Sequence, residues 1–225
     1  MRLAVVVSGI LFGLAQMGCL AGEGSDDPLL GGGSESSTED DVAAATEEDG
    51  EVVDDGVSAP ACEAPTSDLG VNPGQILDLS TELKDCDGNL VSLVDLACGA
   101  NAILIDIGAQ WCEPCKNEAS HLEAEIVQHF KDQGVVVISV ITQDKDGNPA
   151  TNDTCDWWVN EFGLSSPVVT DPTGQTNKWV LGDASQTMPV NIILDADFRI
   201  VSYLTGGLSP EELQSKIAGV VGGSE

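Results

Sequence analysis

Two cysteines separated by two residues have the clearest capacity for chemistry in this sequence. They are Cys112 and Cys115, in the segment 111–116 (WCEPCK). At the start of a helix, free backbone N–H groups and the helix dipole stabilise a thiolate and lower its pKa. A cysteine one turn later can form a disulfide with the first and so release a mixed disulfide. The pattern predicts a redox pair, with Cys112 as the exposed attacking thiolate and Cys115 as the buried resolving thiol.

A Cys-x-x-Cys pair also occurs as half of many zinc sites and in haem attachment motifs. The zinc interpretation lacks a second such pair, or a His pair at the required spacing. The haem interpretation is excluded because Lys116 stands where a His is required. His121 and His129 are eight residues apart on one expected helix, so we do not expect them to share a metal ion. The sequence predicts no metal and no cofactor other than the redox disulfide.

A strand and a helix are expected to position this pair. Residues 102–107 (AILIDI) form an almost continuous apolar run, which is typical of a strand buried on both faces. Pro114 begins a helical pattern in which apolar residues recur at spacings of three and four until Gly134. The dithiol is therefore expected where a buried strand leads into the first turn of a helix.

The rest of the domain alternates between strand and helix patterns. The other expected strands lie at residues 76–79, 90–93, 135–141, 168–169, 190–194 and 199–203. The other expected helices are one capped by Asn152 or Asp153, a short one at 174–181 and a last one capped by Ser209. A turn is expected at 85–89. This order predicts an α/β sandwich around a mixed central sheet.

Residues 103–116 (ILIDIGAQWCEPCK) resemble the thioredoxin superfamily. The Cys-Glu-Pro-Cys centre, with the turn segment before it, resembles the TlpA/ResA branch of envelope thiol-disulfide reductases. The resemblance covers roughly residues 70–219 and implies a thioredoxin-like three-layer sandwich with an N-terminal β-hairpin extension. It further implies an enzyme that reduces disulfides in exported proteins and receives electrons from a membrane thiol donor.

Two acids carry over from this resemblance as catalytic candidates. Asp106, six residues before Cys112, matches the buried acid of the thioredoxin type. A carboxyl on a buried strand should have a raised pKa, and it could exchange a proton with Cys115. Glu118, three residues after Cys115, matches a helix glutamate near the disulfide in the ResA-like group. The sequence leaves open which of the two acids accepts the proton.

The resemblance also implies a substrate-binding surface beside the dithiol. Met188 and Pro189 directly precede a buried strand, where the family has a cis-proline. A cis bond there would place the backbone of Met188 beside the disulfide, in position to pair with an extended substrate segment. Trp111, Glu113 and Pro114 are the other expected substrate contacts. The chain departs from the branch at residues 107–108, where an aromatic residue is usual.

Two other functions are compatible with some of these features. A peroxiredoxin-like thiol peroxidase shares the fold, but its usual Thr-x-x-Cys setting is absent and the two cysteines here are close in sequence. A non-enzymatic copper-binding module of the Sco type would use two cysteines and a distant His. Its typical spacing is Cys-x3-Cys, and neither His121 nor His129 is suitably placed.

The first 19 residues have the composition of a secretory signal. An apolar run at 3–14 is too short to cross a bilayer, because a transmembrane helix needs about 20 apolar residues. A small residue followed by Cys19 resembles the bacterial lipobox, in which the cysteine is acylated, although Gln16 stands where Leu is usual. Leu20, rather than Asp, follows the cysteine. The resemblance therefore implies lipid anchoring in the cell envelope, at the outer membrane, with the domain facing the periplasm or the exterior.

Residues 20–60 are rich in Gly, Ser, Thr, Asp and Glu and contain no aromatic residue. Such a segment has too little apolar surface to offset the entropy of ordering, so we expect an acidic disordered linker before a domain at 61–225. The formal net charge of the chain is −30, and acids outnumber bases in both parts. Because such a surface repels phosphates, nucleic acid is not an expected partner. We expect a monomer.

Of the seven cysteines, four remain to be paired once Cys19, Cys112 and Cys115 have been given other roles. With Cys19 acylated and the dithiol set apart, the remaining four can form two structural disulfides in three ways. Cys86 and Cys98 flank a short hairpin-like stretch, which favours a Cys86–Cys98 bridge and leaves Cys62–Cys155.

Overall fold

The computed structural model describes residues 62–181 and 187–223 of the chain. The expected signal peptide, Cys19 and the expected linker lie outside the described residues. The described part contains one mixed sheet of seven strands in the order β2-β1-β5-β4-β3-β6-β7. The strands are β1 (Glu82–Lys84), β2 (Leu90–Ser92), β3 (Ala102–Gly108), β4 (Val135–Ile141), β5 (Val168–Thr170), β6 (Val190–Asp195) and β7 (Ile200–Thr205).

Parallel strands form the centre of this sheet. β3 pairs in parallel with β4, and β4 with β5. β6 pairs antiparallel with the other edge of β3, and β7 with β6. The hairpin β1–β2 joins the sheet through an antiparallel contact with β5. This arrangement confirms the expected mixed sheet. An N-terminal hairpin is present as expected, but its first strand is Glu82–Lys84 and not residues 76–79.

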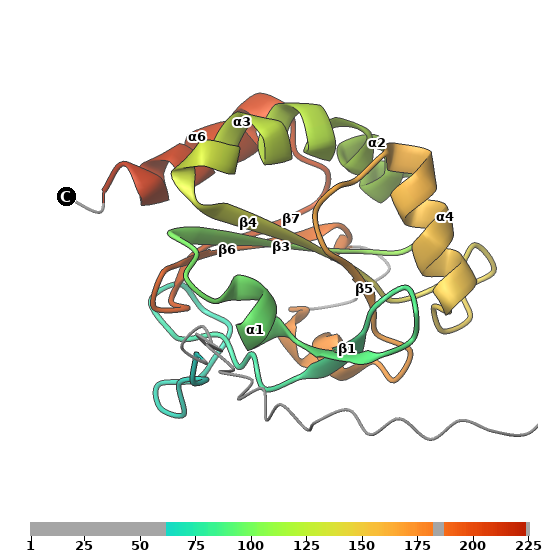
Figure 1. Cartoon of the computed structure of the whole chain (residues 1–225), viewed down its shortest axis with the longest axis horizontal. Helices are drawn as coiled ribbons and strands as arrows, with labels where there is room; N and C mark the ends of the chain where they lie inside the picture. Colours follow the sequence, from blue (N-terminus) through green and yellow to red (C-terminus); the bar gives the residue numbers. More distant parts are fainter. Residues whose placement is uncertain (1–61, 182–186, 224–225) are drawn as a thin grey trace, which may run out of the picture. The chain divides into compact units, whose positions relative to one another are not determined.

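Helices cover both faces of the sheet, as Figure 1 shows for α2, α3 and α6 on one face and α1 on the other. The α-helices are α1 (Leu93–Ala97), α2 (Glu113–His121), α3 (Gln128–Phe130), α4 (Asn152–Phe162) and α6 (Pro210–Val221). A π-helical segment, η1 (Leu122–Val127), joins α2 to α3, and two 3-10 segments are η2 (Lys131–Gln133) and η3 (Gln175–Trp179). The long helix expected after the dithiol therefore runs from α2 to η2 and ends at Gly134.

The core lies between the sheet and these helices. All seven residues of β3 are buried, as predicted for a strand covered on both faces. α6 buries Leu213, Ile217 and Val220, which lie three and four residues apart on one face of the helix. Ser209 caps α6 as predicted, with Glu212 completing a capping box.

Three tight turns in the domain share one sequence pattern and one set of hydrogen bonds. They span residues 85–89 (DCDGN), 144–148 (DKDGN) and 195–199 (DADFR). In each, the first Asp accepts a bond from the backbone N–H four residues later, at 2.8–2.9 Å. The fourth residue has a positive φ, which suits Gly88 and Gly147, whereas Phe198 adopts it in the third turn.

Three expected details of secondary structure are wrong. Residues 76–79 do not form a strand, because Asp78 accepts hydrogen bonds from both the backbone and the hydroxyl of Ser80 and turns the chain there. The strand expected at 90–93 ends at Ser92, whose side chain caps the unexpected helix α1. Thr151, rather than either following residue, caps α4 through a capping box with Thr154.

The predicted pairing of the four structural cysteines is also wrong. The disulfides are Cys62–Cys98 and Cys86–Cys155, and not Cys86–Cys98 with Cys62–Cys155. Cys86 lies in the turn of the β1–β2 hairpin, whereas Cys98 follows α1, after the chain has returned along β2. The two are therefore at opposite ends of the hairpin. β1 pairs with β5, which contacts α4, and this brings Cys86 to Cys155.

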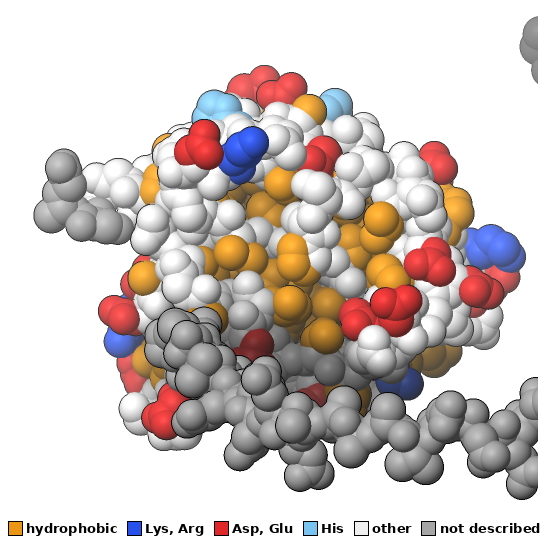
Figure 2. All heavy atoms as spheres, viewed as in Figure 1, with side chains coloured by type: hydrophobic (Ala, Val, Ile, Leu, Met, Phe, Trp, Pro, Cys, Tyr) orange, Lys and Arg blue, Asp and Glu red, His pale blue; other side chains and the backbone are white. Residues whose placement is uncertain are grey.

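The surface of the domain is acidic. On the face shown in Figure 2, Asp and Glu side chains surround a central area of apolar side chains, and Lys and Arg are few. Four ion pairs are found among the described residues, each with at least one partly exposed member. In the part of the chain that the structure describes, no helix is long and apolar enough to cross a membrane.

Candidate active site

The dithiol lies where the sequence places it, between β3 and α2. Cys112 is the N-cap residue of α2, and its Sγ accepts a hydrogen bond from the backbone N–H of Cys115 at 3.2 Å. The two cysteines form a disulfide with a Cα–Cα distance of 5.3 Å. Donation from the first turn of the helix would equally stabilise a Cys112 thiolate in the reduced protein.

The prediction that Cys112 is exposed is wrong for the oxidised protein, in which Cys112 and Cys115 form a disulfide. Cys112 is 3% exposed and Cys115 is 1% exposed, so both sulfur-bearing residues are buried. The Cys112 side chain points to the first turn of α2, where its Sγ meets the N–H of Cys115 and is bonded to Cys115 Sγ. Gly108 makes room for the pair, because a Cβ there would lie 3.4 Å from Cys115 Sγ.

A hydrogen-bonded turn holds the segment before the dithiol. Trp111 Nε1 donates to Gln143 Oε1 at 2.8 Å, and Gln143 Nε2 donates to the Gly147 carbonyl at 3.0 Å. The backbone N–H of Gln110 donates to the Gln143 carbonyl at 2.9 Å. The Asp144–Asn148 turn therefore fixes the orientation of the Trp111 ring beside the redox pair. The sequence alone did not indicate this role for Gln143.

Two of the expected substrate contacts, Pro114 and Met188, line separate hollows in the surface of the domain. One, of about 690 Å³, is lined by Pro114 from α2 and by residues 207–210 from the loop before α6. The other, of about 290 Å³, is lined by Met188, Gln143 and Asn177 among others. Glu113 is exposed at the first turn of α2 and forms an ion pair with Lys116. Pro114 and Met188 therefore do not share one hollow, and Trp111, Glu113 and Pro189 line neither of the two.

The peptide bond between Met188 and Pro189 is cis, as predicted. Both residues are buried, and β6 begins directly after them. The backbone N–H of Gly206 donates to the carbonyls of Thr187 and Pro189, at 3.0 and 2.8 Å. These bonds attach the segment to the end of β7.

The two predicted acids are both buried, at 2% exposure each. Burial raises the pKa of Asp106 well above its ordinary value, and the neighbouring Glu118 carboxylate raises it further. Burial also raises the pKa of Glu118, although hydrogen bonds from the Leu208 N–H and the Asn191 side chain act in the opposite direction. Burial therefore favours the protonated form of both carboxyls, which suits an acid–base group that exchanges a proton with a thiol.

Sequence reasoning missed two polar neighbours of Asp106. Ser139 on β4 and Asn191 on β6 are its register partners on the two adjacent strands, and both are fully buried. Each is a polar residue within an apolar strand, VVVISVI and VNIILD respectively. That contrast was visible in the sequence, but only the register of the sheet places both beside Asp106.

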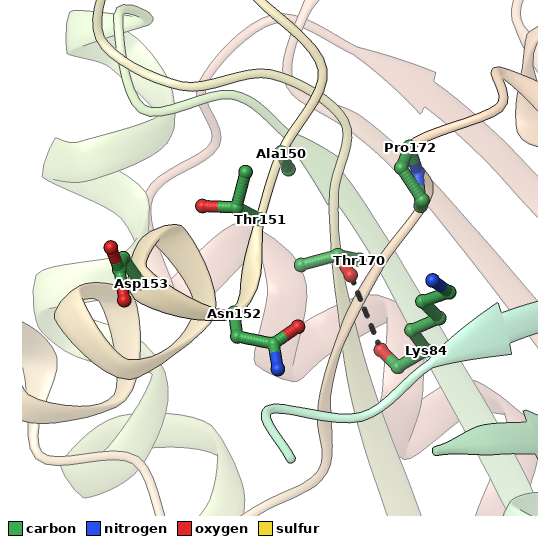
Figure 3. A pocket seen from close by; sticks show the side chains of 7 residues that line it. All are labelled: Lys84, Ala150, Thr151, Asn152, Asp153, Thr170 and Pro172. Atoms are coloured by element: carbon green, nitrogen blue, oxygen red, sulfur yellow. Dashed lines mark hydrogen bonds between the residues drawn. The ribbon is translucent and has the colours of Figure 1, made fainter. Parts of the chain in front are cut away.

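A further hollow, of about 400 Å³, lies away from the redox pair. Figure 3 shows Lys84, Thr170 and Pro172 on one side and the first residues of α4 on the other. Thr170 Oγ1 donates to the Lys84 carbonyl at 3.4 Å. None of the predicted site residues lines this hollow, so we do not assign the chemistry to it.

Comparison with known proteins identifies the family. Residues 76–203 match the model of the AhpC/TSA family. The chain belongs to the AhpC/TSA family. The AhpC/TSA match includes the dithiol, both buried acids, the Met188–Pro189 segment and Asn191, and it excludes Cys62 and α6.

Similar proteins of known structure have the same fold. A secreted thiol-disulfide isomerase from Corynebacterium glutamicum is 19% identical, with a TM-score of 0.54 covering 66% of this chain and 86% of that one. A secreted Mycobacterium tuberculosis disulfide oxidoreductase homologous to DsbE of E. coli is 15% identical, with a TM-score of 0.51 covering 63% and 96%. These similarities confirm the predicted thioredoxin-like fold for this AhpC/TSA member.

An uncharacterized protein of Haemophilus influenzae is 24% identical over 134 residues, which is 59% of this chain and 81% of that protein. Membership of the AhpC/TSA family fits both the predicted disulfide reductase and the alternative thiol peroxidase. The chemistry must therefore be argued from the site itself.

Proposed function

We propose that this protein is a thiol-disulfide oxidoreductase of the cell envelope that reduces disulfides in exported proteins through Cys112 and Cys115. The observation that carries the proposal is the disulfide across the first turn of α2, with Cys112 Sγ accepting the N–H of Cys115. A sulfur at a helix start is the one that a lowered pKa would make nucleophilic. Two separate disulfides elsewhere in the domain support an oxidising compartment.

The proposed reaction transfers two electrons to the substrate. The Cys112 thiolate attacks one sulfur of a substrate disulfide, forms a mixed disulfide and releases the other sulfur as a thiolate. Cys115 then gives its proton to a buried carboxylate, and its thiolate attacks Cys112 Sγ. This step forms the Cys112–Cys115 disulfide and breaks the mixed disulfide, so the substrate leaves with two reduced sulfurs. An external dithiol, proposed to be a membrane thiol donor, must reduce the protein disulfide before the next cycle.

The residues around the pair have separate roles in this proposal. Met188, which precedes the cis-bonded Pro189, offers its backbone groups to an extended substrate segment beside the disulfide. Trp111, whose ring is held by a hydrogen bond to Gln143, contacts the substrate next to Cys112. Asp106 and Glu118 exchange the proton of Cys115. No metal and no separate cofactor enters these steps.

The thiol peroxidase alternative uses the same fold but different chemistry, because peroxide rather than a disulfide would oxidise Cys112. Here the partner cysteine is already bonded to Cys112 within one helical turn. That geometry favours rapid ring closure after attack on a disulfide. We therefore rank disulfide reduction above peroxide reduction for this site.

The reduction potential of the Cys112–Cys115 couple tests the proposal. A potential near or below about −250 mV is expected, which corresponds to the reducing side of the thioredoxin-like scale. A potential of about −120 to −180 mV would contradict the reductase direction and favour an oxidase or isomerase. A Cys112→Ser/Cys115→Ser variant should lose the couple completely. Turnover of peroxide by the wild-type protein, without disulfide reduction, would favour the peroxidase instead.

We also propose that the mature protein is attached to the membrane through a lipid on Cys19. The lipobox-like segment and the acidic stretch that follows it support this proposal. Mass spectrometry of protein from a bacterial host should detect a diacylglyceryl-modified Cys19 at the N-terminus. A Cys19→Ser variant should move to the soluble fraction of the envelope. Retention of that variant in the membrane would contradict lipid anchoring.

A further inference from the structure

A row of buried polar side chains crosses the central sheet beneath the redox pair. Asp106 lies on β3, between its register partners Ser139 on β4 and Asn191 on β6. All three are 2% exposed or less. Side chains of register partners point to the same face of a sheet. That face is the one covered by α2, because Asn191 Nδ2 donates to Glu118 on that helix.

The two carboxyls linked by this row have unequal hydrogen-bond partners. Glu118 Oε1 accepts from Asn191 Nδ2 at 2.8 Å, and Glu118 Oε2 accepts from the Leu208 N–H at 2.6 Å. By contrast, Asp106 Oδ1 and Asn191 Oδ1 are buried without a hydrogen-bond partner. N–H donors stabilise an ionised carboxyl, whereas burial without donors favours the neutral acid. A neutral Asp106 would carry a hydroxyl, and each neighbouring strand offers a buried acceptor without a partner, Ser139 Oγ on β4 and Asn191 Oδ1 on β6. Of these two residues, Asn191 is the one that also bonds to Glu118.

We infer that Asn191 is a positioning residue for the dithiol exchange, linking the two carboxyls so that Asp106 holds a proton while Glu118 stays ionised. This inference rests on the proposed function. A side-chain amide has both donors and an acceptor, so it can bind a carboxylate on one side and a carboxylic acid on the other. Leucine, of similar size, could do neither.

This assignment decides between the two acids that the sequence left equivalent. Cys115 and Glu118 are three residues apart on α2, a spacing at which helix side chains are neighbours. With Asp106 already protonated, Glu118 is the carboxylate that takes the proton from Cys115 Sγ. The Cys115 thiolate can then attack Cys112 Sγ, and Glu118 returns its proton to solvent or to the released substrate thiolate.

Few other charged groups face this pair. The small hollow over Glu118 is lined by His121 and otherwise by apolar residues of η1, α6 and the preceding loop, namely Leu122, Ile126, Leu208, Pro210 and Leu213. From the flanking strands come Ser139 and Asn191, which do not titrate in the ordinary pH range. Lys116, on the same helix, is paired with Glu113. Besides Cys112 and Cys115, which are thiols in the reduced protein, His121 is therefore the further titratable group among these contacts that a pH profile must take into account.

The test is a carboxyl titration of the reduced full chain by NMR. Glutamate labelled with ¹³C at the side-chain carboxyl reports Glu118, whose resonance is assigned by its loss in Glu118→Gln. Asn191→Leu should raise the pH at which Glu118 ionises by about one unit or more, because it removes a hydrogen bond to a charged group. The acid limb of the disulfide-reductase pH profile should move upward by the same amount.

Three controls separate the proposed role from general disruption. Ser139→Ala changes an equally buried neighbour of Asp106 that does not bond to Glu118. It should therefore leave the pH at which Glu118 ionises unchanged. If Asn191→Leu does not fold, Asn191→Thr replaces it, because Thr is well suited to a strand. Asn191→Thr should also raise the pH at which Glu118 ionises. His121→Gln removes the other titratable group in the hollow and should not abolish the shift.

The outcomes distinguish this inference from the proposed function. A Glu118 that is protonated at pH 7 in the wild-type protein would overturn the inference, as would an unchanged titration in a folded Asn191→Leu protein. An equal shift in Ser139→Ala would also overturn it. The titration does not depend on turnover. By contrast, a Cys112→Ser/Cys115→Ser variant that retains reductase activity would contradict the proposed function alone.

Discussion

At the residue scale, the site combines the Cys112–Cys115 pair with Asp106, a buried acid whose ionised form is disfavoured by burial. Asp106 has no charged partner of opposite sign in the contacts described, and burial and Glu118 both raise its pKa. The folded protein therefore keeps a proton on Asp106 at pH values where the unfolded chain has released it. The contribution of Asp106 to folding stability therefore falls as pH rises above about 3.9, the ordinary pKa of Asp, until the raised folded pKa is passed.

Asp106→Asn should remove this loss of stability. At pH 3 the variant and the wild type should unfold at similar urea concentrations. At pH 7 the variant should be more stable by about 1 kcal/mol or more, because each unit of raised pKa corresponds to about 1.4 kcal/mol. Urea unfolding across this pH range measures the difference. Asp132→Asn, at an exposed position, controls for the loss of one negative charge, and an equal gain there would contradict the explanation.

Gly108 is a second residue whose identity the site requires. A Cβ there would lie 3.2 Å from Cys115 Cβ and 3.9 Å from the Trp158 ring, and neither neighbour is a flexible chain end. Gly108→Ala should therefore destabilise the oxidised protein by about 1–3 kcal/mol, the usual cost of overpacking. Gly219→Ala is the matched control. It lies in α6 with nothing within 4 Å of its Cβ position, so it should stabilise the helix by about 0.5–1 kcal/mol. Thermal unfolding compares the two, and equal effects would contradict the packing argument.

At the element scale, short turns position the site as much as the long elements do. The Asp144–Asn148 turn is closed by its first Asp and bonds to Gln143, which in turn holds Trp111. Gly147 has a φ of 82° with nothing near its Cβ position, so only backbone conformation restricts it. The orientation of the tryptophan therefore depends on a glycine with no contact to it.

Gly147→Ala should reduce stability by about 1–2 kcal/mol, the cost of a left-handed conformation for an L-residue with a side chain. Gly147→Asn should cost less, because Asn tolerates that conformation better. The same order should appear in the fluorescence of Trp111, measured as a difference from Trp111→Phe. If Ala and Asn had equal effects, crowding rather than backbone conformation would explain the loss.

The elements that the sequence predicted best are those with strong local patterns. β3, β4 and the helix after the dithiol follow from continuous apolar runs and three-four spacing, and the Cys-x-x-Cys pair follows from its motif. Residues 76–79 show the limit of such patterns. They bury Leu77 and Leu79 as an alternating strand would, but a local Asp78–Ser80 bond turns the chain. The polar row at Ser139 and Asn191 could not be found without the register of three strands, which local sequence does not encode.

At the scale of the whole molecule, two disulfides connect segments that are far apart in the sequence. Cys62–Cys98 has a sequence separation of 36 and fastens the first described residues to the end of α1. Cys86–Cys155 has a separation of 69 and fastens the hairpin turn to α4. The pairing depends on the tertiary contact of β1 with β5. Spacing along the sequence favoured a different pair, because it ignores which end of a hairpin each cysteine occupies.

Removing either bridge should lower the free energy of unfolding by about 2–4 kcal/mol, because loops of these lengths restrict the unfolded chain to a similar degree. The paired variants Cys62→Ala/Cys98→Ala and Cys86→Ala/Cys155→Ala test this by urea unfolding. Neither should abolish disulfide reduction, since neither bridge includes the redox pair. Peptide mapping without reductant should recover 62 linked to 98 and 86 linked to 155. Recovery of a native 86–98 link would show that the hairpin turn and the end of α1 meet after all, and it would overturn the placement of β1 beside β5 from which the pairing follows.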